Sequence, residues 1–237
     1  MPTSKPDPLN SEAIAGAERL VAERFALGRC LGHRQGTDIH MALDVKTSDT
    51  VVLKSVPAGA FTPGALMRLE YEASLLLQLH SDWVAPLVDF GRDGQQLYVA
   101  WKYFPGVPLE IRLREGALPL DETIVVARSL FSALRDLHAC QVLHRSVRPA
   151  NLILDQRRPL QRATLVDFGP TRAIEPDAPL NRQPLDVALY ASPEQAGSID
   201  HDVTAASDLY SAGVVLFHCL TGRPPFHGSS VGAILFE

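Results

Sequence analysis

The sequence is poor in three features that would each define a class of protein. It has only three cysteines in 237 residues, far apart at positions 30, 140 and 219, which is neither a disulfide framework nor a Cys-x-x-Cys metal pattern. Its formal net charge of −5 provides no basic field for nucleic acid or anionic membranes. The most apolar stretch, 212–220, is too short to span a bilayer. We therefore expect a cytoplasmic protein with no nucleic-acid partner and no membrane insertion.

The chain otherwise has the composition of an ordinary folded protein, and its expected secondary structure changes near residues 103–107. Hydrophobic residues make up 46% and charged residues 21%, which is typical of globular domains. Strand-like segments dominate before this point and helical patterns after it. We predict a two-lobed α+β fold: a lead-in over 1–24 that ends in a helix from residue 11, a β-rich lobe over 25–104 and a helical lobe over 105–237.

Apolar periodicity and turn residues define the expected elements. Strands are predicted at 25–31, 38–45, 51–56, 85–89 and 96–103, and two short apolar runs follow at 152–154 and 163–166. One helix has its apolar face at Leu66, Leu69, Ala73, Leu76 and Leu77. A second has Ile124, Ala127, Leu130, Phe131, Leu134 and Leu137 on one face, with Asp121 as its cap. Residues 208–220 are apolar on nearly every side, which predicts a buried helix that ends at Gly222.

Five segments in a particular order carry the chemistry. They are Val-Val-Leu-Lys at 51–54, Glu-Ala at 72–73, His-Arg-Ser-Val-Arg-Pro-Ala-Asn at 144–151, Val-Asp-Phe-Gly at 166–169 and Tyr-Ala-Ser-Pro-Glu at 190–194. From about residue 25 to the end, this set resembles the signature of eukaryotic-type protein kinases, and most of all bacterial serine/threonine kinase domains. The resemblance implies the two-lobed protein-kinase-like fold, with the helical lobe incomplete after the long buried helix.

The resemblance implies a site for ATP and Mg²⁺. Lys54 matches the strand lysine that contacts the α- and β-phosphates, and Glu72 matches the helix residue that orients this lysine, with Glu70 as the competing candidate. Asp167 matches the aspartate that holds magnesium, and Asn151, 16 residues earlier, matches the second magnesium ligand.

The remaining nucleotide-binding matches are Gly32, Val52, Trp101, Tyr103 and Ile153. Gly32 is the one glycine of the phosphate-covering loop that stays in register, which restricts close backbone approach to the phosphates. Val52 replaces a smaller alanine. Trp101 either closes the back of the adenine pocket or is a plain core aromatic.

The sequence departs from the family pattern at the catalytic loop. Ser146 replaces the aspartate that accepts the substrate's proton, and a neutral hydroxyl cannot act as that base. Losing a general base typically costs about 10²–10⁴ in rate, or about 3–5 kcal/mol of barrier. Arg148 replaces the lysine that bridges to the γ-phosphate. Val187 replaces the threonine that usually bonds the missing aspartate.

The resemblance gives several other residues a structural role or bears on regulation. Asp208 matches the buried-helix aspartate that braces the catalytic loop, and His144 is assigned to packing beneath Phe168. The other histidines show no metal-ligand spacing. Between Gly169 and Tyr190 the only hydroxyl residue is Thr171, so switching by phosphorylation in mid-segment is not expected.

Three functions stay open on the sequence. The first is a regulatory pseudokinase that binds ATP and Mg²⁺, the second an active but slow serine/threonine kinase, and the third an interaction domain that needs no nucleotide. Residues 193–223 resemble the N-terminal kinase-like domain of bacterial hybrid sensor kinases. The expected partners are therefore other proteins or downstream signalling modules of the same, longer chain.

Overall fold

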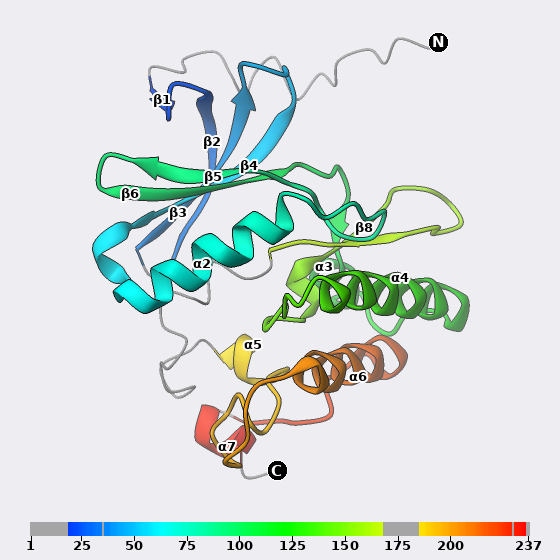
Figure 1. The fold of residues 1–237 in the computed structure, drawn as a ribbon. Helices are drawn as coiled ribbons and strands as arrows, with labels where there is room; N and C mark the ends of the chain where they lie inside the picture. Colours follow the sequence, from blue (N-terminus) through cyan, green and yellow to red (C-terminus); the bar gives the residue numbers. More distant parts are fainter. Residues whose placement is uncertain (1–18, 35, 168–184, 229, 236–237) are drawn as a thin grey trace. The chain divides into compact units, whose positions relative to one another are not determined.

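The computed structural model describes residues 19–34, 36–167, 185–228 and 230–235. The chain divides into two compact units, one of residues 1–64 with 86–103 and one of residues 65–85 with 104–237. The first unit is built on strands and the second largely on helices (Figure 1), so the predicted α+β class is confirmed. The domain boundaries drawn from the sequence stay predictions.

The first unit contains a six-stranded antiparallel sheet in the order β1-β2-β3-β4-β6-β5. Its strands are β1 (Leu20–Val21), β2 (Phe25–Arg34), β3 (Thr37–Asp44), β4 (Thr50–Pro57), β5 (Leu87–Asp93) and β6 (Gln96–Lys102). A short 3₁₀ turn, η1 (Ala58–Ala60), follows β4. The five predicted strands are confirmed with shifted ends, because alternation of apolar residues is a local signal that the sheet preserves.

The prediction of a helix over 11–24 is wrong where the structure describes it. Residues 20–21 form strand β1, and Ala22 and Glu23 make a tight turn with φ of 51° and 55°. The turn folds β1 back onto β2, so that Val21 pairs with Phe25. Burial of both side chains against the sheet overrides the helical propensity of this segment. Residues 11–18 lie outside the described part of the chain.

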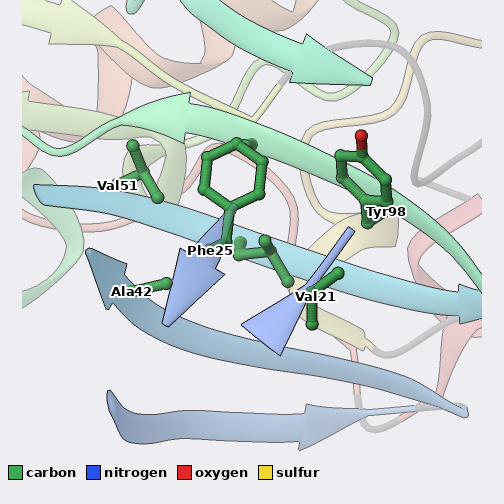
Figure 2. Close-up of a cluster of buried hydrophobic side chains, with 7 residues drawn as sticks. Val21, Phe25, Ala42, Val51 and Tyr98 are labelled. Atoms are coloured by element: carbon green, nitrogen blue, oxygen red, sulfur yellow. The ribbon is translucent and has the colours of Figure 1, made fainter. Parts of the chain in front are cut away.

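A buried hydrophobic cluster holds β1 against the sheet. Val21, Phe25, Ala42, Val51 and Tyr98 pack together in Figure 2, with Leu53 and Ala100 completing the cluster. The rings of Phe25 and Tyr98 are tilted by 57° with centroids 5.8 Å apart. Full burial of a phenylalanine contributes about 1.5–3 kcal/mol relative to exposure. Val51 and Leu53 of β4 belong to this cluster, and side chains alternate between the two faces of a strand. The cluster therefore lies on the face of the sheet opposite to the Lys54 side chain.

The second unit contains helices and one small sheet. Its elements are α2 (Pro63–Leu76, whose first two residues belong to the first unit), β7 (Val107–Pro108), α3 (Leu109–Leu113), α4 (Leu120–Ala139), η2 (Pro149–Asn151), β8 (Leu152–Leu154), β9 (Ala163–Leu165), α5 (Leu185–Ala188), α6 (Ala205–Thr221) and α7 (Val231–Leu235). The small sheet has the order β7-β8-β9. Helix α4 packs on α6 (Figure 1) and also contacts β9. Hydrogen bonds from residues 144 and 145 to Asp208 place the loop between α4 and β8 beside the start of α6.

The predicted helices exist, but their buried faces differ from the predicted ones. In α2, Leu69, Ala73 and Leu76 are buried as expected, whereas Leu77 is exposed. In α4 the predicted face members Ile124 and Phe131 are 58% and 44% exposed. The inner face of α4 combines two small polar residues with five apolar ones: Thr123, Ser129, Val126, Leu130, Ala133, Leu134 and Leu137. Because polar residues form part of the inner face, the spacing of apolar residues alone predicted the wrong buried face.

The ends of α4 and α6 are set by backbone chemistry. Pro119 is the N-cap of α4, so the prediction of Asp121 as cap is wrong and Asp121 lies in the first turn. Thr204 caps α6 in a capping box with Ser207, and Gly222 ends α6 in the left-handed conformation with φ of 73°, as predicted. Helix α6 is not buried on every side, because Leu209, Phe217 and Leu220 are exposed.

The described residues contain no helix that is both long and apolar enough to cross a membrane.

Candidate active site

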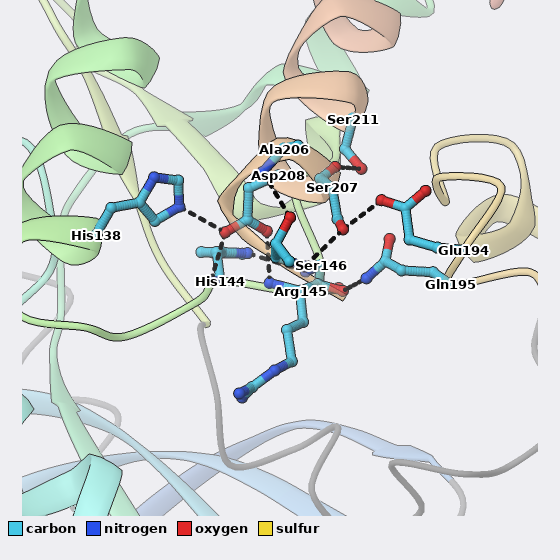
Figure 3. A network of polar contacts seen from close by, with 11 residues as sticks. His138, His144, Arg145, Ser146, Glu194, Gln195, Ala206, Ser207, Asp208 and Ser211 are labelled. Atoms are coloured by element: carbon cyan, nitrogen blue, oxygen red, sulfur yellow. Dashed lines mark hydrogen bonds and ion pairs between the residues drawn. The ribbon is translucent and has the colours of Figure 1, made fainter. Parts of the chain in front are cut away.

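Asp208, in the first turn of α6, is the centre of a buried hydrogen-bond network (Figure 3). Its side chain is 2% exposed. Oδ2 accepts from the backbone N–H of His144 at 2.8 Å and lies 2.9 Å from Nε2 of His138. Oδ1 accepts from the backbone N–H of Arg145 at 2.7 Å. Asp208 therefore braces residues 144–145 of the catalytic loop, as predicted.

The network fixes the protonation states of its two central groups. Burial alone would raise the pKa of Asp208, but the hydrogen bonds from His138, His144 and Arg145 lower the pKa on balance, so the carboxylate is ionised. Desolvation lowers the pKa of His144, which favours a neutral ring. A neutral ring fits its contacts, because Nε2–H donates to the Val166 carbonyl at 3.1 Å and Nδ1 accepts from the Ser146 N–H at 3.2 Å.

Two residues of the site have a left-handed backbone. Arg145 has φ of 60° and Asp167 has φ of 63°. Such a conformation is strained for a non-glycine residue and persists only where neighbouring contacts enforce it. At Arg145 the N–H is held by Asp208, and the carbonyl accepts from Gln195 Nε2 at 3.0 Å. The loop is thus held from both sides in one conformation.

Ser146 stands at the centre of this loop, at the position that the resemblance assigns to the catalytic base. Its carbonyl accepts from Asn151 Nδ2 at 2.8 Å, and its hydroxyl lies 3.4 Å from the same nitrogen. The loop therefore keeps its internal hydrogen bonds around residue 146. What differs is the chemistry of the side chain, which carries a neutral alcohol where the family pattern has a carboxylate.

A small hollow beside the loop brings two of the sequence departures together. It has a volume of about 10 Å³ and is lined by residues 145–148, by Val187 and by Tyr190, Ala191, Gln195 and Ser211. This is about the smallest volume that holds one water. Ser146 and Val187 face the same space, and Arg148 lines it too. The three substitutions therefore cluster at one place in the fold.

Asn151 and Asp167 supply a donor set that fits a magnesium ion. The Val166 N–H donates to the Asn151 carbonyl at 2.9 Å, so Asp167 directly follows a residue whose backbone is bonded to Asn151. Asn151 is 3% exposed, and because its Nδ2 donates to Ser146, its Oδ1 is oriented as the acceptor. Magnesium prefers oxygen ligands, usually one or two from protein with the rest from phosphates and water. Among the described residues no cluster of three His, Cys, Asp or Glu side chains could hold a metal ion.

Glu72 has a partner that the sequence did not indicate. Both carboxylate oxygens of Glu72 accept from the guanidinium of Arg145, at 2.7 and 3.0 Å. The pairing of Glu72 with Lys54 stays a prediction. The Glu72 side chain is 7% exposed. The competing candidate Glu70 is exposed, which favours Glu72 as the functional acid of α2.

The segment after the hollow packs onto the start of α6. Glu194 accepts a short hydrogen bond from the Ser207 hydroxyl, and the Tyr190 hydroxyl lies 2.8 Å from His218 Nδ1. Burial alone would raise the pKa of Glu194, but the bond from Ser207 and others lower the pKa, so this acid is ionised. These contacts hold the segment that carries Val187 and Gln195 beside the catalytic loop.

The first unit holds most of the predicted nucleotide contacts. Lys54 is 6% exposed on β4, and Trp101 is 4% exposed on β6 directly opposite Val52. Trp101 is therefore a buried aromatic paired with Val52 across the sheet, and its part in an adenine pocket stays a prediction. The backbone N–H of Tyr103 donates to Thr50 at 3.1 Å. Ile153 lies in β8 of the second unit and is half-buried.

Gly32 and Gly36 have different roles in the hairpin of β2 and β3. Gly32 lies at a register shift in β2, and a Cβ there would meet nothing within 4 Å. Gly36 has φ of 77°, so the turn itself requires glycine at this position. Phe168, Gly169 and Thr171 lie outside the described residues, and so does the predicted packing of His144 beneath Phe168.

Sequence reasoning missed three residues of the site. His138, Gln195 and Ser207 bond Asp208, Arg145 and Glu194 respectively. His138 was grouped with surface or core histidines. The only available signal was its place in α4, one helical turn after Leu134, on the side that faces α6.

Comparisons with known proteins agree with this arrangement. A family model described as "Protein kinase domain" matches residues 25–235. The chain is 32% identical over 232 residues to the probable serine/threonine-protein kinase PknB of Bifidobacterium longum, covering 92% of this chain and 33% of that protein. It is 30% identical over 225 residues to PknB of Mycobacterium leprae, covering 92% and 35%. The chain thus spans about a third of the length of these relatives.

The crystal structure of the Mycobacterium tuberculosis PknI kinase domain has the same fold. It superposes with a TM-score of 0.71 at 23% sequence identity, over 90% of this chain and 78% of that one. Members of this family generally use ATP and Mg²⁺. With the family match covering most of the chain, and with the loop around Asp208 arranged as the signature requires, the chain belongs to the protein kinase domain family and is a homologue of the bacterial eukaryotic-type serine/threonine kinases.

Proposed function

We propose that this chain is a kinase-like signalling domain that binds ATP with Mg²⁺ but transfers phosphate poorly, which makes it a regulatory pseudokinase. One observation carries the proposal. The catalytic loop keeps its bracing by Asp208 and its Asn151 contacts, while residue 146 has no acidic group. A site that had decayed as a whole would not be expected to retain a strained backbone held by these hydrogen bonds.

ATP is the nucleotide proposed, with Asn151 and Asp167 as the residues that would hold its magnesium. When bound, the magnesium–ATP complex supplies a polarised γ-phosphoryl group. Lys54 is the proposed contact to the phosphates, and its burial keeps its charge poorly screened. Val52 and Trp101 are proposed to face the adenine, with Gly32, Tyr103 and Ile153 completing the set.

The residues of the catalytic loop are proposed to position rather than to deprotonate an acceptor. The Ser146 hydroxyl is neutral, so it does not remove the proton from an attacking alcohol. Arg148 keeps the positive charge of the lysine that it replaces, but a planar guanidinium presents that charge differently from an ammonium. Phosphoryl transfer depends mainly on positioning and electrostatics. This dependence, together with the intact Asn151 and Asp167, favours a slow serine/threonine kinase as the second candidate.

The expected partners follow from the length of the relatives. Since the chain spans about a third of them, we propose that the domain acts within a longer cytoplasmic signalling protein, on its downstream modules or on protein partners. No phosphoacceptor is assigned.

Thermal unfolding with and without ATP and Mg²⁺ tests the proposed binding. At 100-fold above Kd, ligand binding adds about 2.7 kcal/mol to the free energy of unfolding. Lys54→Met and Asp167→Asn should lose this stabilisation, while Lys46→Met and Asp202→Asn, at exposed positions, should keep it. Absence of any shift at millimolar ATP would leave only the nucleotide-independent interaction domain. Rapid phosphotransfer by the native chain would favour the active kinase.

A further inference from the structure

A larger cavity lies on one face of the sheet of the first unit. Its volume is about 150 Å³, and the residues that line it all belong to that unit: Arg19, Val21, Leu27, Asp38, His40, Ser55, Asp93 and Gln96. Val21 also belongs to the hydrophobic cluster of Figure 2, and His40 lies two residues before Ala42 of that cluster. Since side chains alternate along a strand, the cavity lies on the face of the sheet opposite to the Lys54 side chain.

The strand register pairs the polar residues of the cavity wall. Asp38 lies directly opposite Ser55 in the ladder of β3 and β4, and Asp93 lies directly opposite Gln96 in the ladder of β5 and β6. Opposed residues of an antiparallel pair have their side chains on the same face of the sheet. The wall therefore contains two carboxylates, each beside an uncharged polar side chain.

The charged residues of the wall favour a cation as the ligand. Asp38 and Asp93 supply two negative charges, and Arg19 supplies one positive charge. Arg19 Nη2 lies 3.9 Å from Asp93 Oδ2, which is an ion pair without a hydrogen bond, and the arginine side chain is 68% exposed. Such an exposed pair is weak. Asp38 Oδ1 lies 2.5 Å from His33 Nδ1, so Asp93 is the carboxylate more available to a ligand.

His40 has one ring nitrogen enclosed by protein. Its Nδ1 is buried and has no hydrogen-bond partner among the described residues. A buried N–H without a partner is rarer in proteins than a buried acceptor without one, which favours the tautomer that carries its proton on Nε2. Because Nδ1 is enclosed, Nε2 is the nitrogen that can reach a ligand. His40 thus offers a hydrogen-bond donor beside the two carboxylates.

We propose that this cavity binds a small protonated amine that also carries a hydroxyl group. The ammonium group would lie against the Asp93 and Asp38 carboxylates, and the hydroxyl oxygen would accept from Nε2 of His40. Val21 and Leu27 would contact the carbon atoms between these two groups. A cavity of about 150 Å³ admits benzene, so a ligand of up to about six non-hydrogen atoms fits. The site uses none of the residues proposed to bind ATP and Mg²⁺, and it goes beyond the proposed function.

Titration of the whole chain with ethanolamine, followed by the imidazole signals of His40 in NMR spectra, tests the site. Ethanolamine should shift these signals in a saturable way. Ethylene glycol, which lacks the positive charge, and acetate, which has the opposite charge, should not. The signals are assigned by their absence in His40→Gln.

Asp93→Asn should raise the Kd for ethanolamine by at least about tenfold, the factor that corresponds to one hydrogen bond to a charged group. Gly94 follows Asp93 in the turn between β5 and β6, and Asn-Gly suits such a turn as well as Asp-Gly does, so this variant should keep the fold. Asp49→Asn, at an exposed position of the same unit, is the matched control and should leave the Kd unchanged.

Three results would overturn the proposal. They are the lack of a saturable shift with ethanolamine, a saturable shift with acetate, which would assign the cavity to anions bound by Arg19, and an equal Kd in the native and Asp93→Asn proteins. If Asp93→Asn melts below the native protein, Asp38→Asn takes its place, and an unchanged Kd in that variant overturns the site equally. The ATP titration is independent, because the two ligands are assigned to opposite faces of the sheet.

Discussion

Replacing Asp208 by asparagine tests whether this one carboxylate holds the catalytic loop. The carboxylate accepts hydrogen bonds from two backbone N–H groups and lies within bonding distance of His138 Nε2. An asparagine of the same shape has one acceptor oxygen, and its amide NH₂ group meets the remaining donors. At least one buried backbone N–H then loses its partner.

The magnitude follows from these contacts. An unsatisfied buried donor costs about 1–3 kcal/mol, and removing one partner of a buried charged pair costs about 3–5 kcal/mol. Since the asparagine oxygen recovers part of this, we expect Asp208→Asn to lower the free energy of unfolding by about 2–5 kcal/mol. The pKa of Asp208 is lowered in the folded state, so its contribution exists above the ordinary value of 3.8 and is lost as the pH falls through the folded pKa.

Urea unfolding followed by circular dichroism measures the change at pH 7 and again at pH 3.5. The difference between native and Asp208→Asn proteins should shrink at the lower pH. Asp202→Asn, at an exposed position, is the matched control and should stay within about 0.5 kcal/mol of the native protein. If Asp208→Asn behaves like this control at both pH values, the bracing role argued from Figure 3 is refuted.

Three further predictions concern other parts of the structure. Burial lowers the pKa of His144 below its ordinary 6.5 in the folded state. As the pH falls below 6.5, the imidazole therefore binds a proton in the unfolded chain but not in the folded one. Stability should therefore decline from pH 6.5 to 5, and His144→Gln should flatten this slope by up to about 1.4 kcal/mol per pH unit in chemical denaturation; an unchanged slope contradicts the assignment. Burial raises the pKa of the Cys219 thiol to about 12, so maleimide should label exposed Cys30 and spare Cys219 until the protein unfolds, as mass spectrometry of digests would show. Gly106→Ala should cost about 1–3 kcal/mol in urea unfolding, since a Cβ there would lie 2.3 Å from the Leu154 carbonyl oxygen, whereas Gly59→Ala, with open space, should not.

The fold was predictable from the sequence wherever local signals decide it. The alternation of apolar residues in β3, β4 and β6 predicts strands without knowledge of the neighbouring strands. The order of the motifs along the chain indicated the family resemblance. Gly222 ends α6 because only glycine takes the left-handed conformation there without strain. The same local reading failed at residues 20–21, where pairing with β2 outweighs helical propensity.

The sequence predicted which residues occupy several positions of the site, but not all of the contacts that these residues make. Asp208 and Asn151 stand where their motifs require, and Ser146 and Val187 line one hollow, as their joint substitution indicated. The contact of Glu72 with Arg145 was not predictable, because Arg145 is 73 residues away in the chain. The exposed positions of Ile124 and Phe131 were also missed, since adjacent helical faces share most of their apolar residues.

The measurement that addresses the central claim most directly is radioactive phosphate transfer from ATP by the native protein and by Ser146→Asp, under single-turnover conditions and on a generic substrate. Restoring a carboxylate within the braced loop should raise the transfer rate by about 10²–10⁴, the usual value of a general base. Equal rates for the two proteins would contradict the claim, because they would show that the alcohol at position 146 does not limit catalysis.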